Sequence, residues 1–368
     1  MTIDRLNRLY SLMSAHSLDA FALNPGPTLT YLTGLEFHLM ERPVVLFLSP
    51  GTNPIMVLPE LEQAKIPQAH IPLQPFPYGE NPAQWGSVFA AATRAAGLDG
   101  KTIGVEPTLL RFLEFQYVQA AAPQAHLISG AEPLAALRMQ KSPAEVARMR
   151  RAVQIAENAL AETLRLIRVG MTEREIASEL TLQLLRAGSD SAFPFKPIVS
   201  GGPNGANPHA SPSDRPIQLG DLLVIDWGAA YEGYISDLTR TFAIGPVDDE
   251  CRRICEIVKQ ANAAGRAAGR PGIPVGQVDA AARAVIDQAG YGQYFIHRTG
   301  HGIGMEGHEA PYIFGENTLL LAEGMAYTVE PGIYLPDRNG VRIEDNIVVT
   351  ANGCETLSTL PRELITIG

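Results

Sequence analysis

Five side chains of the types that hold metal ions are distributed over the second half of the chain. They are Asp226, Asp237, His301, Glu330 and Glu344. Three of the acids follow or interrupt apolar runs of strand length, and a buried carboxylate is costly unless a cation or hydrogen-bond donors compensate it. Acids that converge on one place are explained by two cations that the carboxylates bridge. The pattern therefore indicates a metal site.

His301 lies in a segment that favours a site over a packed histidine. It is flanked by glycines in the sequence TGHGIG, and glycine lets the backbone turn tightly and approach a site closely. His297 precedes it and His308 follows it, so three imidazoles are clustered. The zinc-helix motif HExxH is excluded, because Arg298 replaces its glutamate and glycines disfavour a helix.

The two aspartates can share a pocket only if the chain reverses between them. Asp226 and Asp237 are separated by an odd number of residues, so a turn or a bulge is needed to point both side chains inward. Tyr231-Glu232-Gly233 is expected to form that turn. Taken alone, Asp226 is explained equally well as an exposed aspartate at the end of a strand. His209, in a loop rich in Gly, Asn and Pro, is expected to be exposed and is not decisive alone.

Composition limits the class of protein. The 368 residues suit two domains, and 46% hydrophobic with 18% charged residues is typical of a globular chain. The net charge of −10 argues against a general nucleic-acid binder or a binder of anionic membranes. No signal peptide is expected at the N-terminus, and the apolar runs are too short to span a bilayer. Three cysteines fit a reducing cytoplasm better than a disulfide framework.

The first part of the chain is expected to form a small α/β domain, residues 1–133, with a mixed sheet covered by helices. Its expected helices are 4–16, 83–96 and 109–121, and its expected strands are 19–23, 43–48, 54–58, 102–105 and 126–129. Asn24-Pro25-Gly26-Pro27 is expected to break the chain, and residues 130–133 resemble a linker. No GxGxxG or GxxxxGK[ST] motif supports nucleotide binding.

The second domain, residues 134–368, is expected to repeat an order of two helices followed by strands. Ser142, Pro143 and Glu145 give a strong helix start, with a capping box, for a helix that runs to about residue 168. The other expected helices are 173–186, 249–268 and 275–289, and the expected strands are 195–200, 222–227, 238–243, 326–329, 340–349 and 354–357. This is a weak duplication of pattern without a residue-level repeat.

The five residues, in this order and in the contexts DWGA, SDLTRTF, TGHGIG, TVEPG and VRIED, closely resemble the metallopeptidase family of Xaa-Pro dipeptidases (prolidases), aminopeptidase P and methionine aminopeptidase. The resemblance covers the chain from about Ser142 to its end. The additional domain before it is similar to that of the proline-specific members. The resemblance implies a fold of the α/β (α+β) class, with a small N-terminal α/β domain of the creatinase/prolidase type followed by a catalytic domain of the pita-bread fold.

The resemblance also implies a dinuclear centre of two divalent metal ions. Mn or Co is expected first, with Zn or Fe as alternatives. Asp226 and Asp237 would bind one ion, His301 and Glu330 the other, and Asp237 and Glu344 would bridge them. Glu330 would also carry a proton from the attacking water to the leaving nitrogen. The further residues implied are His209 and His308, which would stabilise the tetrahedral intermediate, His297 and Arg342 on the substrate side, and His38 in a loop of the N-terminal domain.

The activity that the resemblance implies is that of a metal-dependent Xaa-Pro dipeptidase acting on small peptides with proline at the second position. Some dipeptidases of the family carry an arginine after the HE pair to hold the substrate carboxylate, whereas this chain has Tyr312 there, so Arg298 or Arg342 would take that role. An Xaa-Pro aminopeptidase acting on longer peptides is therefore the alternative. A methionine aminopeptidase-like enzyme and a non-catalytic binding protein are less expected. The resemblance further implies a homodimer, and the sparse cysteines indicate a cytoplasmic location.

Overall fold

The computed structural model describes residues 2–368 and divides into two compact units, Met1–Arg138 and Met139–Gly368. The division falls shortly after the boundary expected at residue 133. The segment expected to be a linker begins helix α5 (Ala131–Arg138) instead, and its Leu134 and Leu137 are buried. Arg8 of helix α1 (Thr2–Ala15) donates a hydrogen bond to the Ala136 carbonyl at 2.7 Å, which ties α5 to the N-terminal unit.

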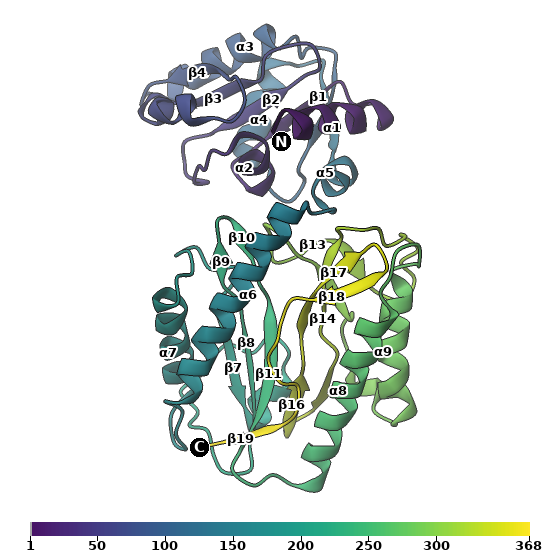
Figure 1. Ribbon diagram of the computed structural model, residues 1–368. Coiled ribbons are helices and arrows are strands. Elements are labelled where there is room, and N and C mark those ends of the chain that lie inside the picture. The colour runs from purple at the N-terminus through teal and green to yellow at the C-terminus, as the bar shows by residue number, and fades with distance from the viewer. Residues whose placement is uncertain (1) are drawn as a thin grey trace. The chain divides into compact units, whose positions relative to one another are not determined.

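The N-terminal unit is a six-stranded mixed sheet with helices packed against it (Figure 1). In spatial order its strands are β4 (Gln74–Tyr78), β3 (Ile55–Pro59), β2 (Val45–Leu48), β1 (Ala20–Leu23), β5 (Thr102–Val105) and β6 (His126–Ser129). Only the pairs β1–β2 and β2–β3 are antiparallel among the described strands of this sheet. Helices α3 (Trp85–Ala95) and α4 (Phe112–Ala121) contribute Phe89 and Val118 to its core.

Several elements of this unit were not expected from the sequence. Helix α2 (Pro27–Thr33) begins at the residue that was expected only to break the chain, because proline suits the first turn of a helix. Strand β4 contains two prolines, which a sheet tolerates at its edge, where β4 lies. The 3₁₀ segment η1 (Glu60–Gln68) has no buried residue and therefore gives no apolar pattern. The short η2 (Pro82–Gln84) precedes α3.

The second unit repeats one arrangement of two helices and a sheet. The first half has helices α6 (Pro143–Leu164) and α7 (Glu173–Arg186) with the sheet β19-β11-β8-β7. The second half has helices α8 (Asp249–Ala268) and α9 (Gly276–Gln288) with the sheet β13-β12-β14-β17-β18. Figure 1 shows the helix pairs on the outer sides and the strands between them. The expected duplication of helices and strands is confirmed.

The strands of this unit are short in both halves. The first half contains β7 (Ile198–Gly201), β8 (Leu222–Trp227), β9 (Ala230–Tyr231), β10 (Tyr234–Ile235) and β11 (Leu238–Ile244), and the 3₁₀ segment η3 (Gly202–Ala206). The second half contains η4 (Gly292–Tyr294), β12 (Gly300–Gly302), β13 (Glu309–Ile313), β14 (Ala326–Val329), β15 (Gly332–Leu335), β16 (Asn339–Arg342), β17 (Asp345–Thr350) and β18 (Gly353–Thr356). The last strand, β19 (Ile365–Ile367), returns to the sheet of the first half, where it pairs with β11. The strand expected over residues 340–349 is divided into β16 and β17, and Glu344 between them bridges to Thr239 of the other sheet.

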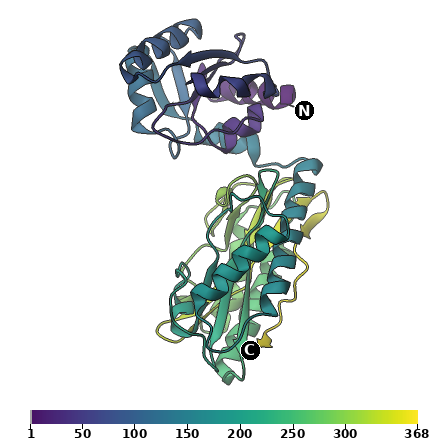
Figure 2. The same ribbon diagram turned by 90° about the vertical axis from the view of Figure 1, so that its left-hand side faces the viewer.

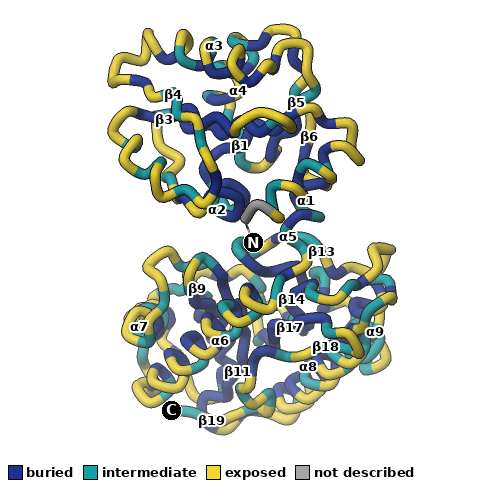
Figure 3. The backbone as a smooth tube through the Cα atoms, turned by 45° about the horizontal axis from the view of Figure 1, so that its top comes forward, coloured by how far each residue is buried: buried dark blue, intermediate teal, exposed yellow. Residues whose placement is uncertain are grey.

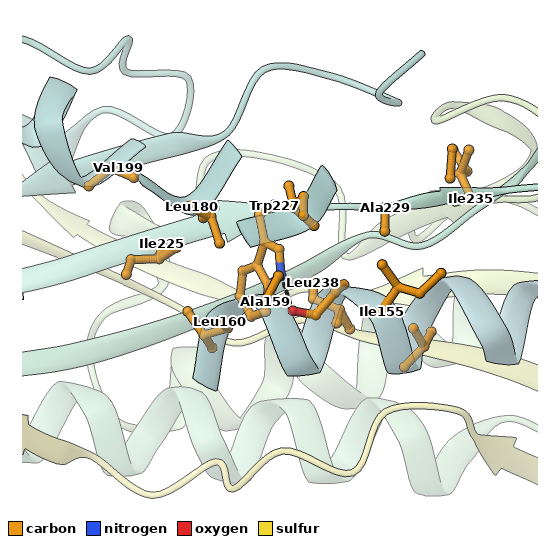
Figure 4. Close-up of a cluster of buried hydrophobic side chains, with 14 of the residues drawn as sticks. Ile155, Ala159, Leu160, Leu180, Val199, Ile225, Trp227, Ala229, Ile235 and Leu238 are labelled. Carbon is orange, nitrogen blue, oxygen red and sulfur yellow. Dashed lines mark hydrogen bonds between the residues drawn. The ribbon is translucent and has the colours of Figure 1, made fainter. Parts of the chain in front are cut away.

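The core of the first half determines which way the strand side chains point. Trp227 of β8 is fully buried against α6, and its indole Nε1 donates to the Ala156 carbonyl at 2.9 Å (Figure 4). Ile225 of the same strand joins this helix-facing core. Because strand side chains alternate between faces, Asp226 points to the opposite face of the sheet.

Burial along the chain agrees with this arrangement of sheets covered by helices. Figure 3 shows the strands of both units largely buried and the outer helices exposed on one side, and Figure 2 shows α6 crossing the face of its sheet. None of the helices in the described part of the chain is long and apolar enough to cross a membrane.

Candidate metal centre

Acidic and imidazole groups from both halves of the second unit converge on one buried place. Asp237, His301 and Glu344 each offer a ligand atom, and these atoms lie within 4.8 Å of one another. Glu330 Oε1 lies 3.3 Å and Asp237 Oδ2 lies 3.8 Å from His301 Nε2. Asp226 is the fifth of the expected residues, and its Oδ2 accepts a 2.6 Å hydrogen bond from Arg342.

The two aspartates are brought together by the reversal that the sequence predicts. Strands β9 and β10 form a hairpin, and Glu232 and Gly233 have positive φ angles of 48° and 75° at its turn. Strands β8 and β11 then pair antiparallel with Trp227 opposite Leu238, so Asp226 of β8 and Asp237, directly before β11, lie at the same end of the pairing. Asp237 is fixed through its backbone, because its N–H donates to Asn346 Oδ1 at 3.1 Å and its carbonyl accepts from Asn346 Nδ2 at 2.6 Å.

The glycines around His301 are required by the packing of strand β12. A Cβ on Gly300 would lie 2.0 Å from the Thr328 carbonyl oxygen, and one on Gly302 would lie 2.2 Å from the Ala310 carbonyl oxygen. His301 Nδ1 lies 3.1 Å from the Gly302 carbonyl, so Nε2 is the ring nitrogen that faces the carboxylates. A register shift between His301 and Gly302 marks a bulge, a device that re-aims a side chain.

Glu344 and Arg342 are held by neighbouring strands. Thr239 of β11 donates to Glu344 Oε2 at 2.7 Å, and Arg342 Nε donates to Thr239 Oγ1 at 3.1 Å. Arg342 also donates to the Tyr334 hydroxyl at 2.9 Å, which in turn lies 2.9 Å from His297 Nε2. Sequence reasoning did not find Thr239 or Tyr334. Thr239 lies within the segment SDLTRTF, but the roles of both residues depend on contacts distant in sequence.

The carboxylates of the cluster have too few positively charged neighbours to balance them. Burial raises the pKa of Asp237 and Glu344 well above the usual range, and the neighbouring carboxylates raise both further. Burial raises the pKa of Asp226 as well, although Arg342 opposes the shift. Burial would also raise the pKa of Glu330, but the hydrogen bond and charge of His301 override it and lower that pKa to about 2.

The donor set fits divalent metal ions. Asp226 Oδ1 is buried and has no hydrogen-bond partner among the described residues. Several carboxylates with a single imidazole suit divalent cations that take oxygen and nitrogen ligands. A cation at this place would satisfy the Asp226 oxygen and offset the repulsion between the acids, so the residues present fit the metal that the sequence pattern indicates.

Two further histidines lie beside the cluster. The ring centroids of His301 and His308 are 3.9 Å apart, and Arg298 Nη2 lies 3.3 Å from His308 Nδ1. Burial, followed by the nearby His301 and Arg298, lowers the pKa of His308 to about 4. Burial also lowers the pKa of His297.

The other two expected histidines are exposed. His209 lies on the loop after η3, and the carbonyl of the preceding Pro208 accepts a 3.3 Å hydrogen bond from Arg342, so the loop approaches the cluster. His38 is exposed in the N-terminal unit, between α2 and β2.

Comparisons with known proteins agree with this fold and site. Residues 147–351 match the family described as metallopeptidase family M24, and residues 5–140 match the creatinase/prolidase N-terminal domain. The fold and site thus define a metallopeptidase with an additional N-terminal domain. The chain belongs to metallopeptidase family M24, and the expected fold class, a creatinase/prolidase-type α/β domain followed by a pita-bread catalytic domain, is confirmed.

The chain is similar to its relatives from end to end. It is 35% identical to the Xaa-Pro dipeptidase of Lactobacillus helveticus over 99% of this chain and 98% of that protein. The structure matches a prolidase from Thermococcus sibiricus with a TM-score of 0.94 and 32% identity, covering 100% of this chain and 99% of that one. It also matches an X-Pro aminopeptidase from Thermotoga maritima with a TM-score of 0.85 and 30% identity, covering 98% and 99%. The family implies a hydrolase that uses divalent metal ions, as expected.

Proposed function

We propose that this protein is an Xaa-Pro dipeptidase, which hydrolyses the bond between an N-terminal residue and a following proline. The observation that carries the proposal is the convergence of Asp237, His301 and Glu344 within 4.8 Å in a chain that matches Xaa-Pro dipeptidases over nearly its whole length. The substrates are accordingly small peptides with proline at the second position.

The metal ligands are the five residues of the cluster. Asp226, Asp237 and Glu344 would hold divalent ions together with His301 and Glu330. When bound, two such ions lower the pKa of a shared water and polarise the substrate carbonyl. We expect the ions to be Mn or Co, with Zn or Fe as the alternatives. The ligand assignment, as distinct from the identity of the metal, is supported by the orphaned Oδ1 of Asp226 and by the crowding of like charges around Asp237.

Glu330 and two histidines handle protons and charge. Glu330 accepts the proton of the attacking water and delivers it to the proline nitrogen, which must be protonated to leave. His308 accepts from Arg298 at Nδ1, so its Nε2 carries the hydrogen and donates toward the oxygen that becomes negative. His209 donates to the substrate from the loop after η3. Thr328 Oγ1 lies 3.2 Å from Glu330 Oε1 and keeps the carboxylate oriented.

A dipeptide substrate also presents a free carboxylate close to the bond that breaks. Arg298 is the cation best placed to receive it, because Arg342 is committed to Asp226 and Tyr334. The Arg298 guanidinium lies 4.4 Å from the centroid of the Tyr312 ring and touches His308. Tyr312, in the place where some relatives have arginine, would thus support the cation instead of replacing it.

The test is a side-by-side comparison of Ala-Pro and Ala-Pro-Ala with the Mn- or Co-loaded protein, with Met-Ala-Ser as a third substrate. Preference for Ala-Pro is the expected result. Preference for Ala-Pro-Ala would identify an Xaa-Pro aminopeptidase, and cleavage of Met-Ala-Ser alone would identify a methionine aminopeptidase-like enzyme. We expect His38→Ala to alter the kinetics, which tests the substrate contact of His38. The oligomeric state of the loaded protein tests the expected homodimer.

A further inference from the structure

The loop that carries His209 is closed at its ends by the buried carboxylate of Glu173. Oε1 of Glu173 accepts hydrogen bonds from the Gly201 N–H at 2.8 Å and from Asn204 Nδ2 at 3.0 Å. Oε2 accepts from Asn204 Nδ2 at 3.0 Å, the Ser213 N–H at 3.0 Å and Ser213 Oγ at 2.6 Å. Glu173 has no exposed surface. These five hydrogen bonds join the beginning and the end of the segment 201–213.

Helix α7 provides the fixed support for this contact. Glu173 is its first residue, and the capping box of Thr172 and Glu175 fixes where the helix begins. The N–H of Glu173 donates to the Arg215 carbonyl and that of Arg174 donates to the Ser213 carbonyl, both at 3.1 Å. The positive end of the helix dipole favours a carboxylate there. The end of the loop is therefore held by backbone and side-chain bonds together.

The inner side of the same loop reaches the metal cluster. Arg342 donates to the Pro208 carbonyl at 3.3 Å while it also binds Asp226. The loop packs tightly at Gly205, since a Cβ on Gly340 would lie 1.7 Å from the Gly205 carbonyl oxygen. The loop thus lies between α7 and Arg342, so the anchoring of its ends determines where His209 stands beside the cluster.

The His209 side chain itself is not held by packing. It is exposed and lines a cleft of about 690 Å³ whose other walls are α7 and residues 193–198. The backbone N–H of His209 donates to Asn207 Oδ1 at 3.0 Å, so the local turn is ordered within the loop. The place of the imidazole consequently depends on where the ends of the loop are anchored.

We propose that Glu173 is a positioning residue for the hydrolysis, because it anchors loop 201–213 so that His209 meets the substrate. This rests on the proposed function, which gives His209 its substrate contact. A glutamine at position 173 has one acceptor oxygen and one NH₂ group, so at least two of the present donors would face another donor. The loop would have to move to relieve that conflict, and a displacement of about 1 Å near a reacting centre costs on the order of 100-fold in rate.

The experiment compares Glu173→Gln with Glu162→Gln, an equally isosteric change at an exposed ion pair of helix α6. We expect Glu173→Gln to lower kcat/KM for Ala-Pro by about 10- to 100-fold. Metal affinity measured by calorimetric titration should stay at the wild-type level, because no proposed ligand lies on the loop. Glu162→Gln should leave both quantities unchanged.

A double-mutant cycle with His209→Ala separates positioning from a general loss of structure. If Glu173 acts through His209, Glu173→Gln should change kcat/KM by less than about twofold once His209 is absent. Additive losses, or wild-type kinetics of Glu173→Gln together with a strong effect of His209→Ala, would overturn the inference. Wild-type kinetics of His209→Ala would instead remove the proposed role of His209 and leave the dipeptidase proposal to its own test.

A milder variant covers the case in which Glu173→Gln does not fold. Ser213→Ala removes a hydroxyl donor to Glu173 and keeps the backbone bond. We expect a smaller loss of kcat/KM in the same direction, which disappears in the His209→Ala background. If Glu173→Gln does not fold and Ser213→Ala shows wild-type kinetics, the result counts against the inference, because the anchor would then matter only for stability.

Discussion

Replacing Lys141 with methionine should lower the free energy of unfolding of the catalytic unit by about 3–5 kcal/mol. Lys141 Nζ lies 2.5 Å from Glu309 Oε1, and the two side chains are only 2% and 7% exposed. The pair joins the segment before α6 to the start of β13, the strand that follows His308. Methionine keeps the length and apolar stem of lysine, so the change removes the charge and leaves the Glu309 carboxylate buried without its cation.

The measurement is urea unfolding followed by tryptophan fluorescence. The chain has two tryptophans, Trp85 in the N-terminal unit and Trp227 in the core of the catalytic unit. A Trp85→Phe background restricts the signal to Trp227, so the transition reports the unit that contains the ion pair. The free energy follows from the midpoint and slope of that transition.

Arg165→Met provides the control for the same chemical change at the surface. Arg165 pairs with Glu162, and these side chains are 73% and 52% exposed, so the loss should stay below about 1 kcal/mol. A loss for Lys141→Met as small as that for Arg165→Met would refute the reasoning that burial makes this pair necessary.

Three further predictions concern other parts of the catalytic unit. Gly302→Ala should destabilise it by about 1–3 kcal/mol or more and weaken metal binding measured by calorimetry, because the new Cβ would lie 2.2 Å from a carbonyl oxygen beside His301. Asp345→Asn should cost about 3–5 kcal/mol in urea unfolding, because it leaves the buried Arg240 without its charged partner; a loss below 1 kcal/mol would contradict this. Burial raises the pKa of Cys251 to about 12 and that of Cys255 further, so both thiols should react with a disulfide reagent only after denaturation, and rapid labelling of the native protein would be evidence against their burial.

Helices whose signals are local could be predicted closely from the sequence. The expected ranges 173–186 and 249–268 coincide with α7 and α8, because Thr172 and Asp248 cap their first turns through side-chain hydrogen bonds. Short strands could not be predicted in the same way. Strand β12 has three residues, two of them glycine, and it exists because β13 and β14 pair with it from either side.

The candidate site could be predicted in its residue types and only partly in its geometry. Alternation along β8 explains why Asp226 faces away from Trp227, and this follows from the local pattern. The break between β16 and β17 at Glu344 does not, since it depends on the bridge to Thr239 of the other sheet. Contacts such as that of Tyr334 with Arg342 also arise from folding and leave no sequence signal.

The measurement that tests the account most directly is Ala-Pro hydrolysis during stepwise loading of the metal-free protein with Mn²⁺, with binding followed by calorimetry. The account predicts no hydrolysis after chelation, two ions bound per chain, and activity that reaches its plateau when both are bound. It predicts that Asp237→Asn loses metal binding and activity together. Full hydrolysis of Ala-Pro by the thoroughly chelated protein, or two bound ions without any hydrolysis of Ala-Pro, would contradict the account.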